Sequence, residues 1–300
     1  MLWKLPILGK ISKIAITPPA PAPDRHGLAI AAIVRNEERH IGEWAAFHAA
    51  AGVRRYIVYD NGCTDGTLAV LRGTLPAEAL AILPWDQVFR DARMGREIHN
   101  QALAYAHAAR NFGRDLRWMA FIDIDEFLVP RQARSLNDAL AHLEGCRSIA
   151  LPWHMFGRSG HVEPPEGGVV ANYLRRAADP MSEARGIRAF KYIVDPCHLT
   201  AVRIHAMETD GSAAACNDLG LRAAEGERGR REFYSAAHVQ LNHYYTRSES
   251  ELAAKIARGP NLRDKSGEYA RKVRRTVANI EAEEVEDRAA LDFLARIGSG

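Results

Sequence analysis

The sequence places three carboxylates inside one apolar run, from Trp118 to Val129. Asp123, Asp125 and Glu126 interrupt residues that are otherwise typical of a buried strand. Because burying an unpaired charge is costly, such acids normally pair with a cation or hold a metal. In an extended chain, residues i and i+2 point to the same face, with Cα atoms roughly 7 Å apart. The spacing therefore predicts that Asp123 and Asp125 bind one divalent cation, Mn²⁺ or Mg²⁺.

The alternative is a strand that ends at Ile122 and is followed by a solvated acidic turn. Phe127, Leu128 and Val129 resume the apolar run at once, which favours the metal interpretation. Glu126 would then either support the metal ligands or close off the strand.

The segments before this run alternate between strand and helix patterns, which is typical of an α/β fold with a mostly parallel central sheet flanked by helices. Ligands of such sheets bind at the carboxyl ends of the strands. Three of the expected ends carry polar residues, at 35–37, 60–65 and 123–126. The predicted strands are 28–34, 55–59 and 79–83, and the predicted helices are 38–51, 68–72 and 94–110.

The second half of the chain is less regular. A Ser135–Asp138 capping pair opens a predicted helix over 135–145, a strand is expected over 149–153, and a glycine-bearing loop follows at 157–168. From Ser248, whose partner in a capping box is Glu251, the pattern becomes helical, and apolar positions recur at helical spacing over 267–297. We therefore divide the chain into a flexible lead-in (1–27), an α/β domain (28–247) and a C-terminal helical extension (248–300).

Composition excludes several classes of protein. Hydrophobic content of 47% and charged content of 26% are ordinary for a globular protein, and a net charge of +3 is too small to indicate nucleic acid binding. Residues 1–16 are too short and too interrupted by lysine and proline to span a bilayer, and we see no signal-peptide cleavage site. We expect a disordered tail there, with peripheral membrane contact as the alternative. The expected location is cytoplasmic, with the inner face of the membrane as the alternative.

The four cysteines lie far apart and form no CxxC pair. This spacing argues against a zinc site or a disulfide framework and favours a reducing compartment.

The order VRNEE, YDNGCTDGT and FIDIDEF resembles a glycosyltransferase of the GT-A (Rossmann-like) fold. More specifically, it is similar to the bacterial family 2-like group related to glycosyltransferase family 92. Three later runs, at 153–161, 191–196 and 241–248, fit the same group, so the resemblance covers about residues 28–260. Family 2-like enzymes usually carry a DDGS-type turn, of which the run at 59–62 keeps only the second aspartate. The resemblance implies a nucleotide-sugar donor, with a UDP-sugar expected, a divalent cation and inversion at the anomeric carbon.

By this resemblance, the first two polar turns should bind the nucleoside. Arg35, Asn36 and Glu37 should line its pocket, and Asp60 should accept a hydrogen bond from the base. Asp65 either contacts the donor or caps the following helix.

The acidic run should hold the ion. By resemblance, Asp123 lies near the ribose or a metal-bound water, Asp125 ligates the ion, and His243 is a third ligand as neutral imidazole. Lys191 should contact a phosphate. A structural role for His243 is the alternative.

The remaining site residues are less closely defined. Arg93 or Arg96 could bind the diphosphate or lie on a solvated helix face, and Asn100 is a weaker pocket candidate on the same helix. The catalytic base is expected from the 157–168 loop, whose titratable groups are His161, Glu163 and Glu166. Trp153 is a candidate for stacking on a sugar, or else a core residue.

The predicted activity is transfer of a sugar to a glycan, lipid-linked or other hydroxyl acceptor. A nucleotidyl- or phosphotransferase could use the same nucleotide and metal pocket, although the sequence has no GxxxxGK[ST] run. A non-catalytic module that binds a glycan or nucleotide is the other alternative, against which the intact Asp123 and Asp125 argue.

Overall fold

The computed structural model of the chain describes residues 9–258 and 266–298. This part is centred on a ten-stranded sheet with the order β13-β12-β7-β9-β5-β2-β3-β4, to which β14 and β6 are joined beside β7. β5, β2, β3 and β4 are parallel neighbours, and β9 runs antiparallel between β5 and β7. The strands are β2 (Leu28–Val34), β3 (Val53–Asp60), β4 (Leu80–Pro84), β5 (Trp118–Phe121), β6 (Glu126–Pro130), β7 (Ser148–Met155), β9 (Phe190–Val194), β12 (Ala215–Cys216), β13 (Arg222–Ala223) and β14 (Val239–His243).

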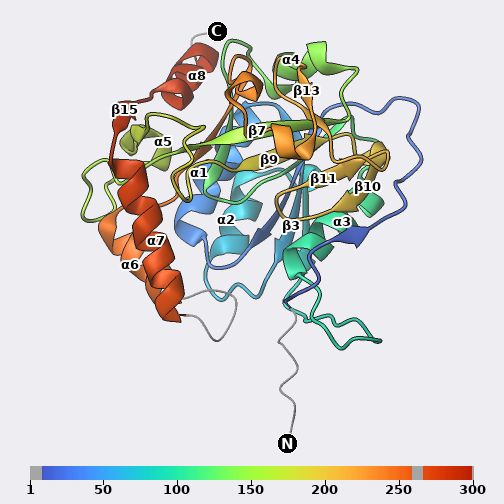
Figure 1. The fold of residues 1–300 in the computed structure, drawn as a ribbon, viewed down its shortest axis with the longest axis horizontal. Helices are drawn as coiled ribbons and strands as arrows, with labels where there is room; N and C mark the ends of the chain where they lie inside the picture. Colours follow the sequence, from blue (N-terminus) through green and yellow to red (C-terminus); the bar gives the residue numbers. More distant parts are fainter. Residues whose placement is uncertain (1–8, 259–265, 299–300) are drawn as a thin grey trace, which may run out of the picture.

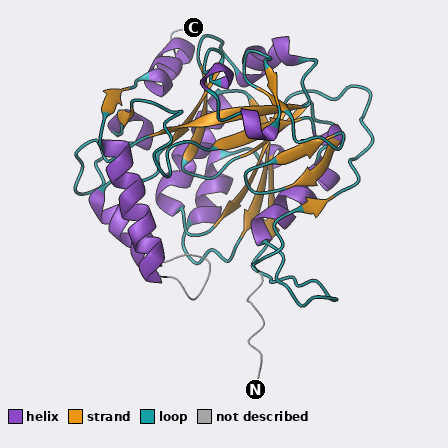
Figure 2. Ribbon diagram, viewed as in Figure 1, coloured by secondary structure: helices purple, strands orange, loops and turns teal. Residues whose placement is uncertain are grey.

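Helices cover both faces of this sheet (Figures 1 and 2), as the alternating sequence pattern predicts. Alternate residues of β2 enter two separate cores: Ile30 packs in the cluster that contains Trp44 of α1, and Ala31 in the cluster that contains Tyr105 of α3. β2 is therefore apolar at every position. The helices are α1 (Glu38–Ala50), α2 (Thr67–Thr74), α3 (Asn100–Phe112), α4 (Leu136–Leu140), α5 (Val169–Asn172), α6 (Glu249–Arg258), α7 (Ser266–Glu281) and α8 (Ala289–Gly298).

The acidic run is not one continuous strand, which corrects the sequence prediction. β5 ends at Phe121 and β6 begins at Glu126, and between them the chain forms a turn in which the Glu126 N–H donates to the Asp123 carbonyl (3.1 Å). The Glu126 carboxylate accepts from the Asp123 N–H (2.7 Å) and so closes the same turn. Asp123 and Asp125 therefore belong to a turn, and the i, i+2 rule for extended chains does not place them on one face.

Two buried side chains of α1 fix β6 beneath this turn. The indole of Trp44 donates to the Glu126 carbonyl (3.0 Å), and Nε2 of His48 accepts from the Leu128 N–H (3.1 Å). Burial lowers the pKa of His48 to about 4, so this imidazole is neutral and can accept that bond.

The helix predicted over 94–110 begins later, at Asn100. Residues 86–99 form a projecting loop instead, because Gly95 adopts a left-handed conformation (φ 64°) and Asp91 Oδ1 accepts from the Met94 N–H (2.6 Å). The helix predicted over 135–145 is also shorter, although its Ser135 cap is confirmed by the hydrogen bond from the Asp138 N–H (3.1 Å).

Residues 9–27, predicted as part of a flexible lead-in, contact the domain at several points. A short strand near the start of the described chain pairs with β10, and Arg25 forms an ion pair with the buried Asp195 (2.8 Å). The rest of that lead-in, residues 1–8, lies outside the described residues. Two smaller sheets contain β1 (Ile14–Ala15), β10 (Leu199–Val202) and β11 (Met207–Thr209), and β8 (Arg175–Ala177) and β15 (Glu284–Glu286).

The periodic stretch over 267–297 is divided rather than continuous. α7 ends at Glu281, β15 pairs with β8, and α8 follows. The break is stabilised by Asp287, whose carboxylate binds Arg176 (2.6 Å) and accepts from the Ala289 N–H (3.0 Å). No helix among the described residues is long and apolar enough to cross a bilayer.

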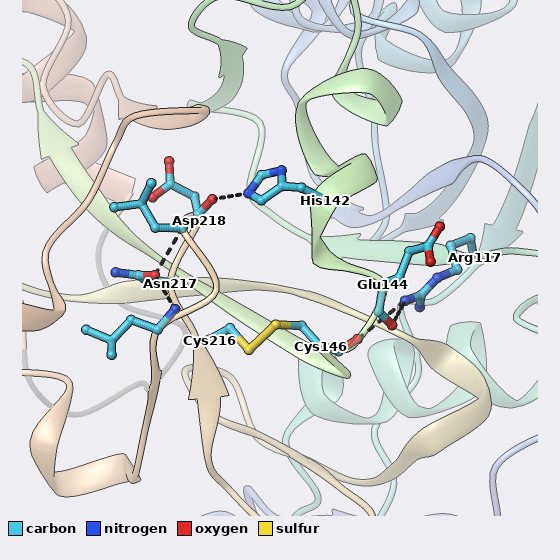
Figure 3. Close-up of a disulfide and its surroundings, with 9 residues drawn as sticks. Arg117, His142, Glu144, Cys146, Cys216, Asn217 and Asp218 are labelled. Carbon is cyan, nitrogen blue, oxygen red and sulfur yellow. Dashed lines mark hydrogen bonds between the residues drawn. A yellow bond between two sulfur atoms is a disulfide. The ribbon is translucent and has the colours of Figure 1, made fainter.

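Cys146 and Cys216 form a disulfide (Figure 3), which corrects the expectation of reduced cysteines. Cys146 precedes β7 and Cys216 lies on β12, the strand that pairs with β7 at Ile149. The two cysteines are 70 residues apart in sequence, so their proximity depends on the pairing of two strands that meet only in the folded sheet.

Candidate active site

A cavity of about 840 Å³ opens where the carboxyl ends of β2 and β3 meet the acidic turn and the start of α6. Five segments of the chain contribute to it: the turn after β2, the turn after β3, the acidic turn, the chain from the end of β14 into α6, and α7 at Tyr269. Its lining includes Asn36, Glu37, Asp65, Asp125, Tyr245, Arg247, Glu251 and Lys255.

The turn after β2 is bound to the turn after β3 by a set of short polar contacts. Asn36 takes the left-handed conformation (φ 54°), and its Oδ1 accepts from the Thr64 N–H (2.8 Å). The Asp65 carboxylate accepts from the N–H groups of Glu38 (3.1 Å) and Thr67 (3.0 Å), at the starts of α1 and α2. Asp65 therefore caps helix N-termini, which is one of the two roles predicted for it. It also lines the cavity, where the other predicted role, contact with the donor, would be possible.

Asp60 and Asn100 hold the chain next to this turn, and neither belongs to the lining of the cavity. Oδ1 of Asp60 accepts from the Cys63 N–H (2.7 Å), which closes the turn after β3. The side-chain amide of Asn100 donates to Asn61 (3.1 Å) and to the Trp85 carbonyl (2.7 Å), while its Oδ1 is buried without a partner. Arg35 is exposed beside them.

The two aspartates of the acidic turn contact different basic side chains. Asp123 accepts from Lys191 (2.7 Å) and from Gln101 (2.8 Å). Lys191 is fully buried and also lies 3.1 Å from Glu126, whose other oxygen accepts from the indole of Trp153 (2.6 Å). Burial lowers the pKa of Lys191, but Asp123 and Glu126 outweigh it, so the pKa is raised and the side chain is charged. Lys191 was expected at a phosphate, and instead it neutralises these two carboxylates.

Asp125 faces the cavity and contacts a second set of basic side chains. Its Oδ2 lies 3.4 Å from His243 Nε2 and 3.6 Å from Lys255 Nζ. Burial raises the pKa of Asp125, but His243, Lys255 and Arg247 outweigh it, so the pKa lies well below its ordinary value. The Tyr244 N–H donates to the Asp125 carbonyl (2.8 Å), which fixes the turn against the end of β14.

Asp125 and His243 are the residues best placed to hold a divalent cation. A carboxylate oxygen suits Mn²⁺ and Mg²⁺, and a neutral imidazole nitrogen can ligate Mn²⁺. Nδ1 of His243 is buried without a hydrogen-bond partner, whereas its Nε2 faces Asp125. Asp123, the other aspartate expected at the ion, is instead engaged by Lys191 and Gln101. Among the described residues no three acidic, histidine or cysteine side chains gather as a complete cage. The protein therefore offers only part of a metal ion's ligands, and the oxygens of a bound diphosphate could complete the coordination.

Several predicted residues do not line the main cavity. Arg96 donates to the Gly9 carbonyl (2.6 Å) and so holds the start of the described chain. His161 bonds the Asn172 carbonyl (3.1 Å), and Glu163 and Glu166 are exposed. Glu166 lines a smaller groove next to the main cavity, and His40 lines both.

Two cations of the cavity were missed by sequence reasoning. Arg247 lies 3.5 Å from Glu37, and its Nε is buried without a hydrogen-bond partner. Lys255 stands on α6, where Nζ donates to the Tyr245 carbonyl (2.7 Å) and lies 3.9 Å from the centre of that ring. Arg247 could have been noticed because it belongs to the motif at 241–248, whereas nothing local distinguishes Lys255 from the other lysines.

A row of ring contacts extends from Tyr245, which lines this cavity, to His243, Trp153 and His205. The ring of Trp153 lies 4.5 Å from His243 and 5.7 Å from His205, and His243 lies 5.4 Å from Tyr245. Desolvation, aided by the charge of Lys191, lowers the pKa of His205 to about 4, so its imidazole is neutral at pH 7. The loop that carries His205, between β10 and β11, was not singled out from the sequence.

Comparison with known proteins agrees with the predicted resemblance. Residues 27–276 match the model of glycosyltransferase family 92. A family 92 protein from Oryza sativa subsp. japonica is 30% identical over 162 residues, which cover 52% of this chain and 26% of the relative. One from Ricinus communis is 27% identical over 162 residues, covering 52% and 27%. The chain thus spans about a quarter of the length of the curated relatives it matches.

Solved structures are similar at a lower level. Glucosyl-3-phosphoglycerate synthase from Mycobacterium tuberculosis, in complex with Mn²⁺, UDP-glucose and phosphoglyceric acid, has a TM-score of 0.30 and 18% identity over 58% of each chain. S. aureus TarS 1-349, in complex with UDP, has a TM-score of 0.36 and 12% identity over 90% of this chain and 70% of that one. Similarities this weak carry no information about the ligands of this chain.

The family assignment therefore rests on the family model, which covers most of the sequence and includes all three polar turns of the site. The predicted relation to this family is confirmed: the chain belongs to glycosyltransferase family 92.

Proposed function

We propose that this protein transfers a sugar from a nucleotide-sugar donor, a UDP-sugar, to an acceptor hydroxyl, with Mn²⁺ or Mg²⁺ and with inversion at the anomeric carbon. The observation that carries the proposal is the wall of the cavity. Asp125, Arg247 and Lys255 line the cavity. His243 is not part of the lining, but it lies 3.4 Å from Asp125 and would add a second donor atom for a divalent cation. A cavity with this combination of charges fits a diphosphate bound with its metal ion.

The donor would lie along the cavity from the polar turns to the acidic turn. Asn36 and Glu37 stand at the end formed by the β2 turn, and Asp60 stands behind them at the end of β3. The nucleoside belongs at this end, and the diphosphate belongs beside Arg247 and Lys255. Arg247 is held in direction by Glu37, so a donor would meet a guanidinium that is already oriented.

The charge of each group suggests its role in the transfer reaction. A bound cation would act as a Lewis acid on the leaving diphosphate. Lys255 and Arg247 would stabilise the negative charge that develops on the same group when the bond from the anomeric carbon to oxygen breaks. Asp123 is held by Lys191 and Gln101. Its carboxylate would stand near the reacting end of the donor.

The acceptor would approach from the side of Trp153. Its indole is partly exposed and is fixed by the bond to Glu126, so it presents a rigid face to a sugar ring. The acceptor oxygen attacks the anomeric carbon while its proton passes to a base. The loop residues His161, Glu163 and Glu166 are one proposed source of that base, and neutral His205, beside Trp153, is another.

A thermal-shift screen of nucleotide sugars with and without Mn²⁺ tests the donor site, because a ligand that binds only the folded state raises the apparent stability. Transfer should then release a nucleoside diphosphate, whereas a nucleotidyltransferase would release pyrophosphate. The variant Asp125→Ala should lose transfer and metal-dependent donor stabilisation while its unfolding temperature without ligand changes little. Glu78→Ala, at an exposed acid away from the cavity, is the matched control. Full turnover in Asp125→Ala with unchanged metal dependence would contradict the proposal.

A further inference from the structure

The outward face of α7, which we name the basic face, carries four exposed basic side chains: Arg271, Lys272, Arg274 and Arg275. The two acids of this helix, Glu268 and Glu281, lie near its ends, and Glu281 binds Arg158 (2.6 Å). None of the four basic side chains forms an ion pair with another described residue. The basic face therefore presents positive charges that no described side chain balances.

The opposite face of α7 is apolar and fixes the helix on the domain. Val273 and Val277 are buried with Leu252 of α6. Ile280 is buried in a second cluster with Met155 of β7. These apolar positions recur every three or four residues, so the basic residues remain on the solvent side. α7 accordingly lies at the edge of the molecule, beside α6 (Figure 1).

The residues of the basic face are close enough to repel one another. Arg271 is three residues from Arg274 and four from Arg275, and Lys272 is three residues from Arg275. Like charges at these spacings are neighbours on a helix and lower its stability. A polyanion bound across the face would offset this repulsion, because its negative groups would lie between the like charges. The arrangement is thus unfavourable for the protein alone and favourable for a complex with a polyanion.

α7 also borders the route between the main cavity and Trp153. Tyr269, near the start of the helix, lines the cavity. Near the end of the helix, Trp153 and Tyr245 pack against the cluster that contains Ile280. An acceptor that approaches the cavity from the side of Trp153 would therefore pass next to α7.

We propose that the basic face binds an acidic acceptor glycan, whose carboxylate or phosphate groups contact its arginine and lysine side chains. This inference rests on the proposed function, because a glycan bound here is an acceptor only if the protein transfers a sugar. Guanidinium groups match the oxygens of carboxylates and phosphates in bidentate fashion. A glycan is favoured over a bilayer, because none of the large hydrophobic side chains exposed among the described residues lies on α7, and nothing there would insert between lipids.

Calorimetry of the full-length protein with short glycans, without donor or metal, tests this inference. The acidic probes are an oligomer of galacturonic acid, which carries carboxylates, and a phosphorylated mannose oligomer. The neutral probe is a glucose oligomer of the same length. We expect at least one acidic probe to bind at low salt and to be released in 1 M NaCl, because exposed charges are then screened. The neutral probe should not bind through α7.

The test variant replaces the whole basic face: Arg271→Gln, Lys272→Gln, Arg274→Gln, Arg275→Gln. It should bind the acidic probe at least about tenfold more weakly, since four exposed charge contacts are lost. Its unfolding temperature without glycan should not fall, because the residues removed repel one another. The matched control removes the same charge from exposed positions on other parts of the fold: Arg72→Gln, Arg110→Gln, Arg114→Gln, Arg222→Gln. This control should bind the acidic probe as the unmodified protein does.

Three results would overturn the inference: no binding of either acidic probe, an equal loss of binding in the control, or tighter binding to phosphatidylglycerol vesicles or single-stranded DNA than to the acidic probes. Stabilisation by UDP with Mn²⁺, measured in parallel, reports on the donor site, and the basic-face variant should keep it. If UDP and Mn²⁺ stabilise the protein and no acidic probe binds, this inference fails and the proposed function stands. If an acidic probe binds through α7 and UDP with Mn²⁺ has no effect, the proposed function fails and α7 remains a glycan-binding face.

Discussion

Replacing Lys191 with methionine tests how the acidic turn is held together. Lys191 is 1% exposed, and its Nζ lies 2.7 Å from Asp123 and 3.1 Å from Glu126. Methionine is nearly the same length, so the variant removes the charge and leaves little empty space. The Glu126 carboxylate, which is fully buried, would then have two hydrogen-bond donors and no cation.

The expected cost follows from the unequal exposure of the two acids. The side chain of Asp123 is 38% exposed, so water can replace Lys191, and that pair contributes about 0–1 kcal/mol. Water cannot reach Glu126, and removing the cation beside a buried carboxylate costs about 3–5 kcal/mol. We therefore expect Lys191→Met to lower the free energy of unfolding by about 3–6 kcal/mol at pH 7.

The loss should depend on pH in a defined direction. Burial raises the pKa of Glu126, and the charge of Lys191 opposes that rise. Without Lys191 the folded-state pKa increases further above the unfolded value of about 4.3. A carboxyl with a raised folded-state pKa binds its proton more readily in the folded state, so stability falls as pH rises through that range. The variant should therefore lose more stability at pH 8 than at pH 5.

Urea unfolding at pH 5 and pH 8 measures both quantities. The variant Lys191→Met, Glu126→Gln should recover part of the loss at pH 8, because no buried charge is left. Lys13→Met, which breaks an ion pair with Glu208 at a half-exposed lysine, should cost at most about 1 kcal/mol. A deficit below about 1 kcal/mol, or one equal at the two pH values, would refute this account of Lys191.

Three further predictions concern other parts of the site and the fold. Asp60→Ala should weaken donor binding in calorimetry more than it lowers kcat, and it should cost about 1 kcal/mol of stability through the lost bond from Cys63 N–H; unchanged affinity with collapsed turnover would contradict this assignment. His243→Ala should raise the Mn²⁺ concentration for half-maximal activity, whereas a purely structural histidine would lower the unfolding temperature and leave that concentration unchanged. Reduction of the Cys146–Cys216 disulfide should lower the free energy of unfolding by up to about 4 kcal/mol, because the bond closes a long loop across 70 residues; thiol counting that finds four free cysteines in the native protein would exclude the bond.

The sequence by itself determined the features that depend on neighbouring residues. The strand over 28–34 is found as β2, because apolar residues on both faces are needed wherever helices cover both sides of a sheet. The capping pairs at Ser135 and Ser248 were predicted correctly, because each cap satisfies an N–H three residues away. The motif order was enough to indicate the family.

Local pattern failed where a buried polar group overrides it. The run around Asp123 is apolar enough for one long strand, yet the Glu126 carboxylate turns back to the Asp123 N–H and breaks it. Glu126 can remain there only because Lys191 and Trp153 reach it from β9 and β7. Those partners are 65 and 27 residues away in sequence, and no local spacing could reveal them.

The make-up of the site was likewise decided by the tertiary structure. The sequence indicated Asp125 and His243, and only the pairing of β14 with β6 and β7 brings them within 3.4 Å. It also assigned Lys191 to a phosphate, whereas the fold places that lysine against Asp123 and leaves Lys255 facing the cavity. The sequence gives the chemical type of each side chain, but the charged groups that surround a side chain depend on which distant segment packs beside it. That proximity is set by burial and pairing across the whole sheet.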